Sequence, residues 1–221
     1  MMPILAPGNL LITVIRACLP AALLLLPGCT LLPASETLTF YRLPPSQIAA
    51  QGDAGQRQAP MHAVLRINTP DGNRSIDSTR ILVVPEADRV SSYYGARWND
   101  RAPVLLRDRL IESFRDAGIF RAVVTDSGNL GADVELSGDL SQFHVIYRSG
   151  SPVVVIVFEA ALVDPASSRI LAARRFHAEQ PVRGKEVPEV VQAFGPAIDQ
   201  LTVQLLAWTR DTAMRLQLSS D

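Results

Sequence analysis

Cysteine and histidine are scarce in this chain, and their positions exclude several kinds of chemistry. The 221 residues contain two cysteines, Cys18 and Cys29. Both lie near the N-terminus, so the rest of the chain offers neither a disulfide nor a thiol nucleophile. None of the three histidines, His62, His144 and His177, has a histidine, cysteine or carboxylate at the spacing of a metal-ligand motif. The sequence therefore predicts no metal site and no thiol catalysis.

An excess of charge of one sign is also missing. The chain has 21 Lys and Arg against 22 Asp and Glu, a formal net charge of −1. This balance excludes a basic nucleic-acid-binding protein and an acidic disordered chain. No phosphate-binding glycine loop, dinucleotide fingerprint or GxSxG elbow occurs. The sequence predicts that the protein is not an enzyme and uses no cofactor.

One carboxylate lies in an otherwise apolar stretch. Glu159 interrupts the run VVVIVFEAALV. An ion pair with Arg174 or Arg175 on the following strand explains this glutamate better than catalysis does. A periplasmic hydrolase would have to use scattered Asp and Ser residues, and it stays a minor alternative.

No apolar run is long enough to span a bilayer. The longest, Ala17–Leu26, has ten residues, whereas a transmembrane helix needs about 20. With Arg16 before it and Gly28 after it, this run is typical of a secretory signal. We predict a signal peptide at residues 1–28.

The residue after the predicted cleavage site is Cys29. Leu26-Pro27-Gly28-Cys29 resembles the lipobox of bacterial lipoproteins, in which the cysteine thiol is acylated, with palmitate for example. We predict lipidation at Cys29 and a short tether at residues 29–36. An ordinary signal peptide with an incidental cysteine and an uncleaved anchor are the alternatives. Residue 30 is Thr rather than Asp, which favours the outer membrane, with the domain facing the periplasm.

The remainder, residues 37–216, is predicted to be one α/β domain. Alternating and continuous apolar patterns predict a mixed sheet of about six or seven strands packed by two main helices. We expect a bulge near Gln142 and a kink at Gly195-Pro196. The strands 153–163 and 169–179 are expected to pair in antiparallel fashion. The expected strands are 37–43, 61–68, 80–84, 119–125, 134–147, 153–163 (covered on both faces) and 169–179. The expected helices are 100–117, capped by Asn99 or Asp100, and 188–216. The order strand, helix, strand over 80–125 predicts a crossover between parallel strands.

The segment 86–99 is predicted to be a long loop rich in aromatic residues. Tyr93, Tyr94, Arg97 and Trp98 are of the types enriched at interface hot spots, and they are the candidate partner-binding residues. The alternative is that Trp98 packs into the core at the start of the helix while the tyrosines half-cover the sheet.

Several segments in order resemble a known family. They are the lipobox, Phe40-Tyr41-Arg42-Leu43, Ile81-Leu82-Val83-Val84-Pro85, Tyr94-Gly95-Ala96-Arg97-Trp98 and a closing Val/Ala/Leu-rich helix. Over about residues 37–210 the chain is similar to the ABC-type transport auxiliary lipoprotein component family, which includes the paraquat-inducible protein C lipoproteins.

The resemblance implies a lipid-anchored docking subunit without catalytic activity. Its partners would be an MCE-domain substrate-binding protein and inner-membrane ABC or permease components, which together move lipids or other hydrophobic molecules. A homo-oligomer stays open, and a lipoprotein for envelope or surface-structure assembly is the alternative function.

Overall fold

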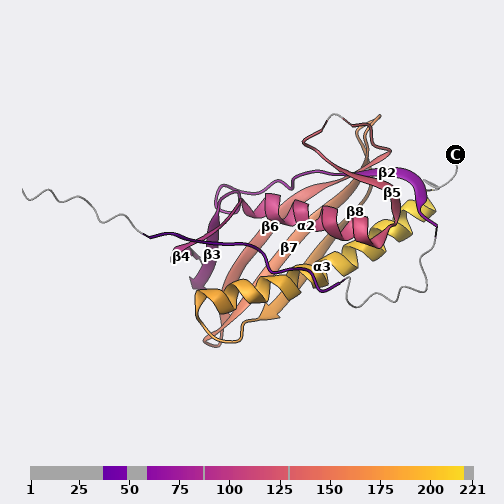
Figure 1. The fold of residues 1–221 in the computed structure, drawn as a ribbon. Helices are drawn as coiled ribbons and strands as arrows, with labels where there is room; N and C mark the ends of the chain where they lie inside the picture. Colours follow the sequence, from indigo (N-terminus) through magenta and orange to yellow (C-terminus); the bar gives the residue numbers. More distant parts are fainter. Residues whose placement is uncertain (1–36, 49–58, 87, 129, 217–221) are drawn as a thin grey trace, which may run out of the picture. The chain divides into compact units, whose positions relative to one another are not determined.

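The computed structural model describes residues 37–48, 59–86, 88–128 and 130–216. The predicted signal peptide, the tether and Cys29 lie outside these residues. A compact unit begins at Thr37 and contains all the described elements. They form a single α/β domain with two helices and a mixed sheet, as the sequence predicts (Figure 1).

The long strand β6 (Val134–Arg148) organises the sheet. β7 (Ser151–Asp164) pairs with it in antiparallel fashion along most of its length, and β8 (Arg169–Pro181) continues the sheet from β7. Two shorter strands lie parallel to β6, β2 (Met61–Ile67) near Leu136 and β3 (Arg80–Glu86) near Val145. The sheet is completed by β5 (Phe120–Thr125) beside β2, β4 (Arg89–Trp98) beside β3, and β1 (Thr39–Tyr41) beside β4.

Gly138 permits the close pairing of β6 with β7. Its φ is 149°, and a Cβ atom there would lie 2.0 Å from the carbonyl oxygen of Glu159. Only glycine fits this position without a backbone shift. Two to four residues after Gly138, the register shifts between Leu140 and Gln142, which confirms the predicted bulge.

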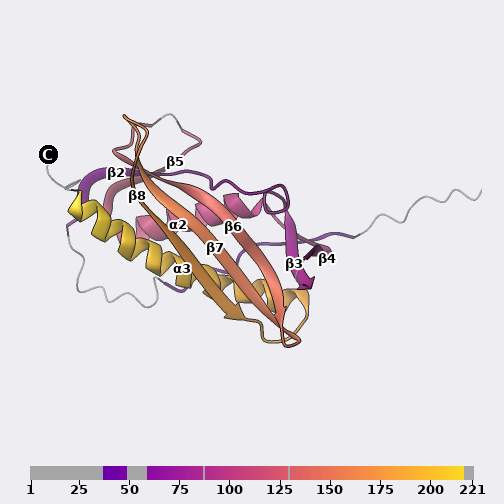
Figure 2. The same ribbon diagram turned by 180° about the vertical axis from the view of Figure 1, so that it is seen from behind.

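Two helices, α2 (Ala102–Ala117) and α3 (Val187–Arg215), cover one face of the sheet (Figures 1 and 2). Three aromatic rings fill the core between them and the strands. The Phe194 ring of α3 lies 5.0 Å from Trp98 and 4.8 Å from Phe143, measured between centroids. All three side chains are fully buried.

The helix ends follow the sequence in part. α2 is capped at its C-terminal end by Gly118, whose φ of 61° is left-handed, a conformation that glycine commonly adopts after a helix. Its N-cap is Arg101 without a side-chain cap, so the predicted capping by Asn99 or Asp100 is wrong. The Asp100 carboxylate accepts a hydrogen bond only from the adjacent Arg101 N–H. α3 continues through Pro196, and a kink there stays a prediction.

The prediction that 153–163 is covered on both faces is only half correct. Val154, Ile156 and Phe158 face the helices, but no described helix lies on the opposite face (Figure 2). Val153, Val155 and Val157 form a second buried cluster there. Longer cross-strand neighbours flank these valines: His144 and Glu179 beside Val155, and Gln142 and His177 beside Val157. The longer side chains on the neighbouring strands cover these valines, so the valines are buried although no helix packs on this face.

One further expectation is wrong, and another is confirmed. The segment 86–99 is not a loop, because Arg89–Trp98 forms β4, paired on both edges. The crossover over 80–125 does join parallel strands, as predicted, although β6 and β2 lie between β3 and β5. β3 and β5 are parallel through their parallel neighbours β6 and β2.

Candidate docking surface

The candidate partner-binding residues lie on β4, between β1 and β3. The strand contains an irregularity that decides where each side chain points. Arg80 of β3 pairs with Arg97, but Leu82 pairs with Ser92, so four residues of β4 stand opposite the single residue Ile81. Gly95 lies in this bulge with a φ of 65°, a left-handed conformation that glycine adopts without strain.

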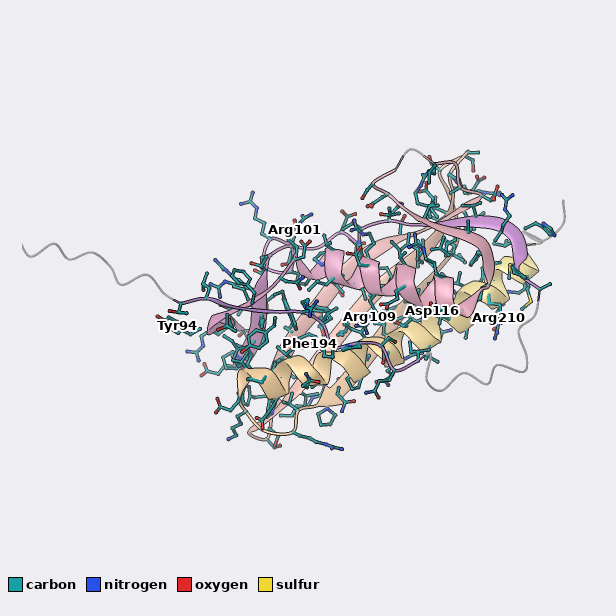
Figure 3. The ribbon with its side chains drawn as sticks, viewed as in Figure 1. Tyr94, Arg101, Arg109, Asp116, Phe194 and Arg210 are labelled. Carbon is teal, nitrogen blue, oxygen red and sulfur yellow. The ribbon has the colours of Figure 1, made fainter. Side chains whose placement is uncertain are left out.

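The bulge turns the two adjacent tyrosines to different environments. Tyr93 packs against the core, and its buried hydroxyl lies beside Tyr147 without a hydrogen bond of normal geometry. Burial raises the pKa of Tyr93, and Tyr147 raises it further. Tyr94 is 81% exposed and is placed at the end of the domain where the described chain begins (Figure 3).

Trp98 belongs to the core, and Arg97 does not. The Trp98 side chain has no exposed surface and packs edge-on against Phe194 and Phe143. Of the two interpretations of Trp98, the structure supports core packing, and this residue is not available to a partner. Arg97 is half-buried, and its guanidinium donates a hydrogen bond to the carbonyl oxygen of Ala96. Tyr94 and Arg97 therefore remain surface candidates.

Sequence reasoning missed other surface residues beside them. Phe40 of β1 pairs with Arg97 and is 62% exposed, while Leu38, just before β1, is also exposed. Arg80 faces Arg97 from the other side. The alternation of Leu38, Phe40 and Arg42 already places these three on one face of a strand. Nothing in that pattern shows that the face is solvent-exposed, because the register with β4 is a long-range feature.

Elsewhere in the domain, Glu159 and His177 each have a structural partner. Glu159 pairs with Arg175 at 3.7 Å, which confirms the predicted ion pair. His177 lies 3.1 Å from a carboxylate oxygen of Glu179, and burial lowers the pKa of His144. Among the residues that the structure describes, no group of three His, Cys, Asp or Glu side chains is arranged to hold a metal ion.

Asp126 has the most strongly lowered carboxylate pKa. Burial alone would raise it, but hydrogen bonds from Thr69 and Thr125 and the attraction of Arg107 lower the pKa to about 2. The Arg107 guanidinium also bonds to the Thr69 hydroxyl and lies 3.2 Å from Asp126. These contacts join α2 to the ends of β2 and β5. The charged Asp126 carboxylate therefore has a structural role.

Comparison with solved structures supports the fold. The protein XCC0632 of Xanthomonas campestris is 28% identical, with a TM-score of 0.70, and the match covers 80% of this chain and 98% of that one. The structure of an uncharacterized protein, 19% identical with a TM-score of 0.59 over 79% of this chain and 99% of its own, shares the fold alone.

A curated relative gives no further information on function. The uncharacterized protein bll6063 of Bradyrhizobium diazoefficiens is 28% identical over 149 residues. The match covers 67% of this chain but only 40% of the relative, so the chain spans about two fifths of that protein's length. None of the described helices is both long and apolar enough to cross a membrane.

A family profile covers most of the folded domain. It matches residues 41–205, from the end of β1 to the last third of α3. This range includes β4, the core residue Trp98, all of α2 and the first two thirds of α3. The chain belongs to the ABC-type transport auxiliary lipoprotein component family.

Proposed function

We propose that the protein is an outer-membrane lipoprotein, anchored through Cys29 and facing the periplasm, that acts as a docking subunit of an MCE/ABC-type transport system for lipids. The observation that carries this proposal is the family match over residues 41–205, in a chain whose first residues resemble a lipobox. The family is one of transport auxiliary lipoproteins and not of enzymes. An adaptor needs an anchor, a stable domain and contact surfaces, and the chain provides a candidate for each.

The test is the capture of partners from detergent-solubilised envelope. A C-terminally tagged, full-length protein is purified with its bound partners, which are identified by mass spectrometry together with co-purifying lipid. We expect enrichment of an MCE-domain protein and of permease components. An unrelated outer-membrane lipoprotein with the same tag is the control.

The alternatives give different results in the same experiment. Capture of envelope-assembly components without any MCE-domain protein would replace the proposal with the assembly function. Turnover of an ester or glycan substrate by the purified protein would contradict the docking role altogether.

A further inference from the structure

We propose that the β1–β4 corner, defined as Leu38, Phe40, Arg80, Tyr94 and Arg97, is the surface with which the domain rests on an anionic phospholipid bilayer. This inference uses the proposed function only for the anchor at Cys29. It concerns what the corner contacts, whatever system the protein serves.

The arginines of the corner supply the first argument. Arg80 and Arg97 are directly opposite each other on antiparallel strands. Like charges in this arrangement destabilise a sheet unless an anion lies nearby. Neither guanidinium forms an ion pair within the described ranges 37–48, 59–86, 88–128 and 130–216. Phospholipid phosphates are anions that guanidinium groups bind well.

The apolar residues of the corner supply the second argument. Phe40 is 62% exposed, Tyr94 81% and Leu38 42%. Phe40 lies beside Arg97, which places an aromatic ring and two cations in one row across β1, β4 and β3. Gly95, next to Tyr94, would place a Cβ atom 3.6 Å from the Thr37 carbonyl oxygen, so Tyr94 lies near the start of β1. Aromatic and apolar groups mixed with basic ones are typical of surfaces that bind at the headgroup level.

The position of the corner along the chain supplies the third argument. Leu38 is the ninth residue after Cys29. At about 3.5 Å per extended residue, the chain holds Leu38 within about 32 Å of an acylated Cys29. The bilayer is therefore always within reach of this corner, at a high effective concentration. A soluble partner has no such advantage, and this favours the membrane as the occupant.

The test is vesicle co-sedimentation with a chain that has no acyl group. The chain from residue 29, carrying Cys29→Ser, retains the whole described domain with its core, so it folds without the anchor. It is mixed with vesicles of phosphatidylcholine alone or with phosphatidylglycerol added, at low and high salt. We expect binding to the anionic vesicles only, weakening as salt rises.

Two variants address the two arguments separately. Arg80→Gln with Arg97→Gln should lower binding about fivefold for each charge removed. Phe40→Ser with Tyr94→Ser should lower binding to a similar extent and leave the salt dependence in place. The matched controls are Arg121→Gln with Arg210→Gln and Ile170→Ser with Val203→Ser. They remove exposed groups outside the corner, and Arg210 lies at the opposite end of the domain (Figure 3).

The proposal is overturned if the corner variants bind anionic vesicles as the parent chain does, or if the controls lose as much binding. It is also overturned if the lipidated corner variants lose capture of a protein partner while vesicle binding is unchanged. In that case the corner is a protein interface, and the docking function stands. If vesicle binding follows the expectation but no MCE-domain protein is captured, the docking function fails and the membrane-facing corner stands.

Discussion

At the scale of single residues, the neighbouring tyrosines of β4 differ in a way that solution measurements can detect. Tyr93 carries a buried hydroxyl whose pKa is raised by burial and by Tyr147, whereas Tyr94 is 81% exposed. In the unfolded chain Tyr93 loses its proton near pH 10, and in the folded protein it holds that proton to higher pH. Above pH 10 the unfolded state therefore binds fewer protons, and stability falls as the pH rises.

We predict that Tyr93→Phe reduces this alkaline loss. At neutral pH the change should be close to neutral, because it removes a buried hydroxyl that lacks a well-formed hydrogen bond. Between pH 9 and pH 11 the variant should lose less stability than the wild type, as measured by urea unfolding at each pH. Tyr94→Phe is the control and should follow the wild-type curve. If the free energy of unfolding fell equally with pH in wild type and Tyr93→Phe, Tyr93 would ionise equally in the folded and unfolded states, which would contradict this prediction.

Sequence reasoning identified the residue types at this corner but not their directions. Alternation along a strand would place Tyr93, Gly95 and Arg97 on one face. The bulge at Gly95 interrupts this alternation. As a result Tyr93 and Trp98, which would lie on opposite faces of a regular strand, both face the core. A bulge depends on pairing with β3 and on one left-handed glycine, and neither can be read from the local pattern.

At the scale of elements, a short segment fastens the start of the domain to its helices. We call Pro44–Ile48 the strap. Asp199 of α3 accepts hydrogen bonds from the Ser46 hydroxyl and the Gln47 N–H, at 2.9 and 2.8 Å. Arg109 of α2, 6% exposed, lies 3.2 Å from Asp199 and also donates to the Pro44 carbonyl oxygen.

Gly195 completes this contact from the other side. A Cβ atom at residue 195 would lie 3.1 Å from Cβ of Pro44, so the absence of a side chain lets the strap lie close to α3. From the sequence, Gly195-Pro196 is expected to kink the helix, and residues 44–60 are assigned neither a strand nor a helix. The strap was missed because its partners are about 65 and 153 residues away along the chain.

We predict that Arg109→Met destabilises the domain by about 3 kcal/mol, because it leaves the carboxylate of Asp199 with little solvent and no cation. The double variant Arg109→Met with Asp199→Leu should lose less than the sum of the two single changes. Urea unfolding measures all three. The exposed ion pair of Arg101 and Asp77 is the matched control, and Arg101→Met should cost about 0–1 kcal/mol.

An equal effect of Arg109→Met and Arg101→Met would show that the strap is held by packing alone. The comparison is informative because both arginines donate to an aspartate, but the Arg109 side chain is 6% exposed and also bonds to the strap, whereas the Arg101 side chain is 50% exposed. Limited proteolysis within residues 37–48 gives a second measurement, and cleavage should be faster in the Arg109 variant.

β4 is the element that the sequence did not predict. Its first eight residues, RVSSYYGA, combine two serines, a glycine and exposed side chains, all of which are common in loops. It becomes a strand because β3 lies on one side and β1 on the other. The strands and helices with continuous or strictly periodic apolar patterns, such as β6, β7 and α3, were predicted nearly to their ends, since burial alone specifies them.

At the scale of the whole molecule, the anchor, the first residues of the β1–β4 corner and the strap follow one another closely in the sequence. An acylated Cys29 would be followed by the tether, then by β1 beside the corner, then by the strap on α2 and α3. A force applied to the tether would be transmitted to the helices through β1 and the strap, which ends about 20 residues after Cys29. If the corner rests on the bilayer as proposed, it would limit how the domain can turn at the membrane, and the remaining surfaces would face away from the bilayer.

The anchor itself is tested by localisation of the full-length protein. More than one acyl chain, at about 0.8 kcal/mol per buried methylene, gives stable attachment, whereas the corner alone gives weak binding that salt reverses. We therefore predict that Cys29→Ser releases the protein from the membrane fraction after a wash with 1 M salt. Thr30→Asp should retain the acyl groups and move the protein from the outer to the inner membrane fraction. If the wild type carries no acyl mass, or Cys29→Ser still sediments after the wash, the attachment must come from another part of the chain, and the position of the corner nine residues from an anchor would lose its significance.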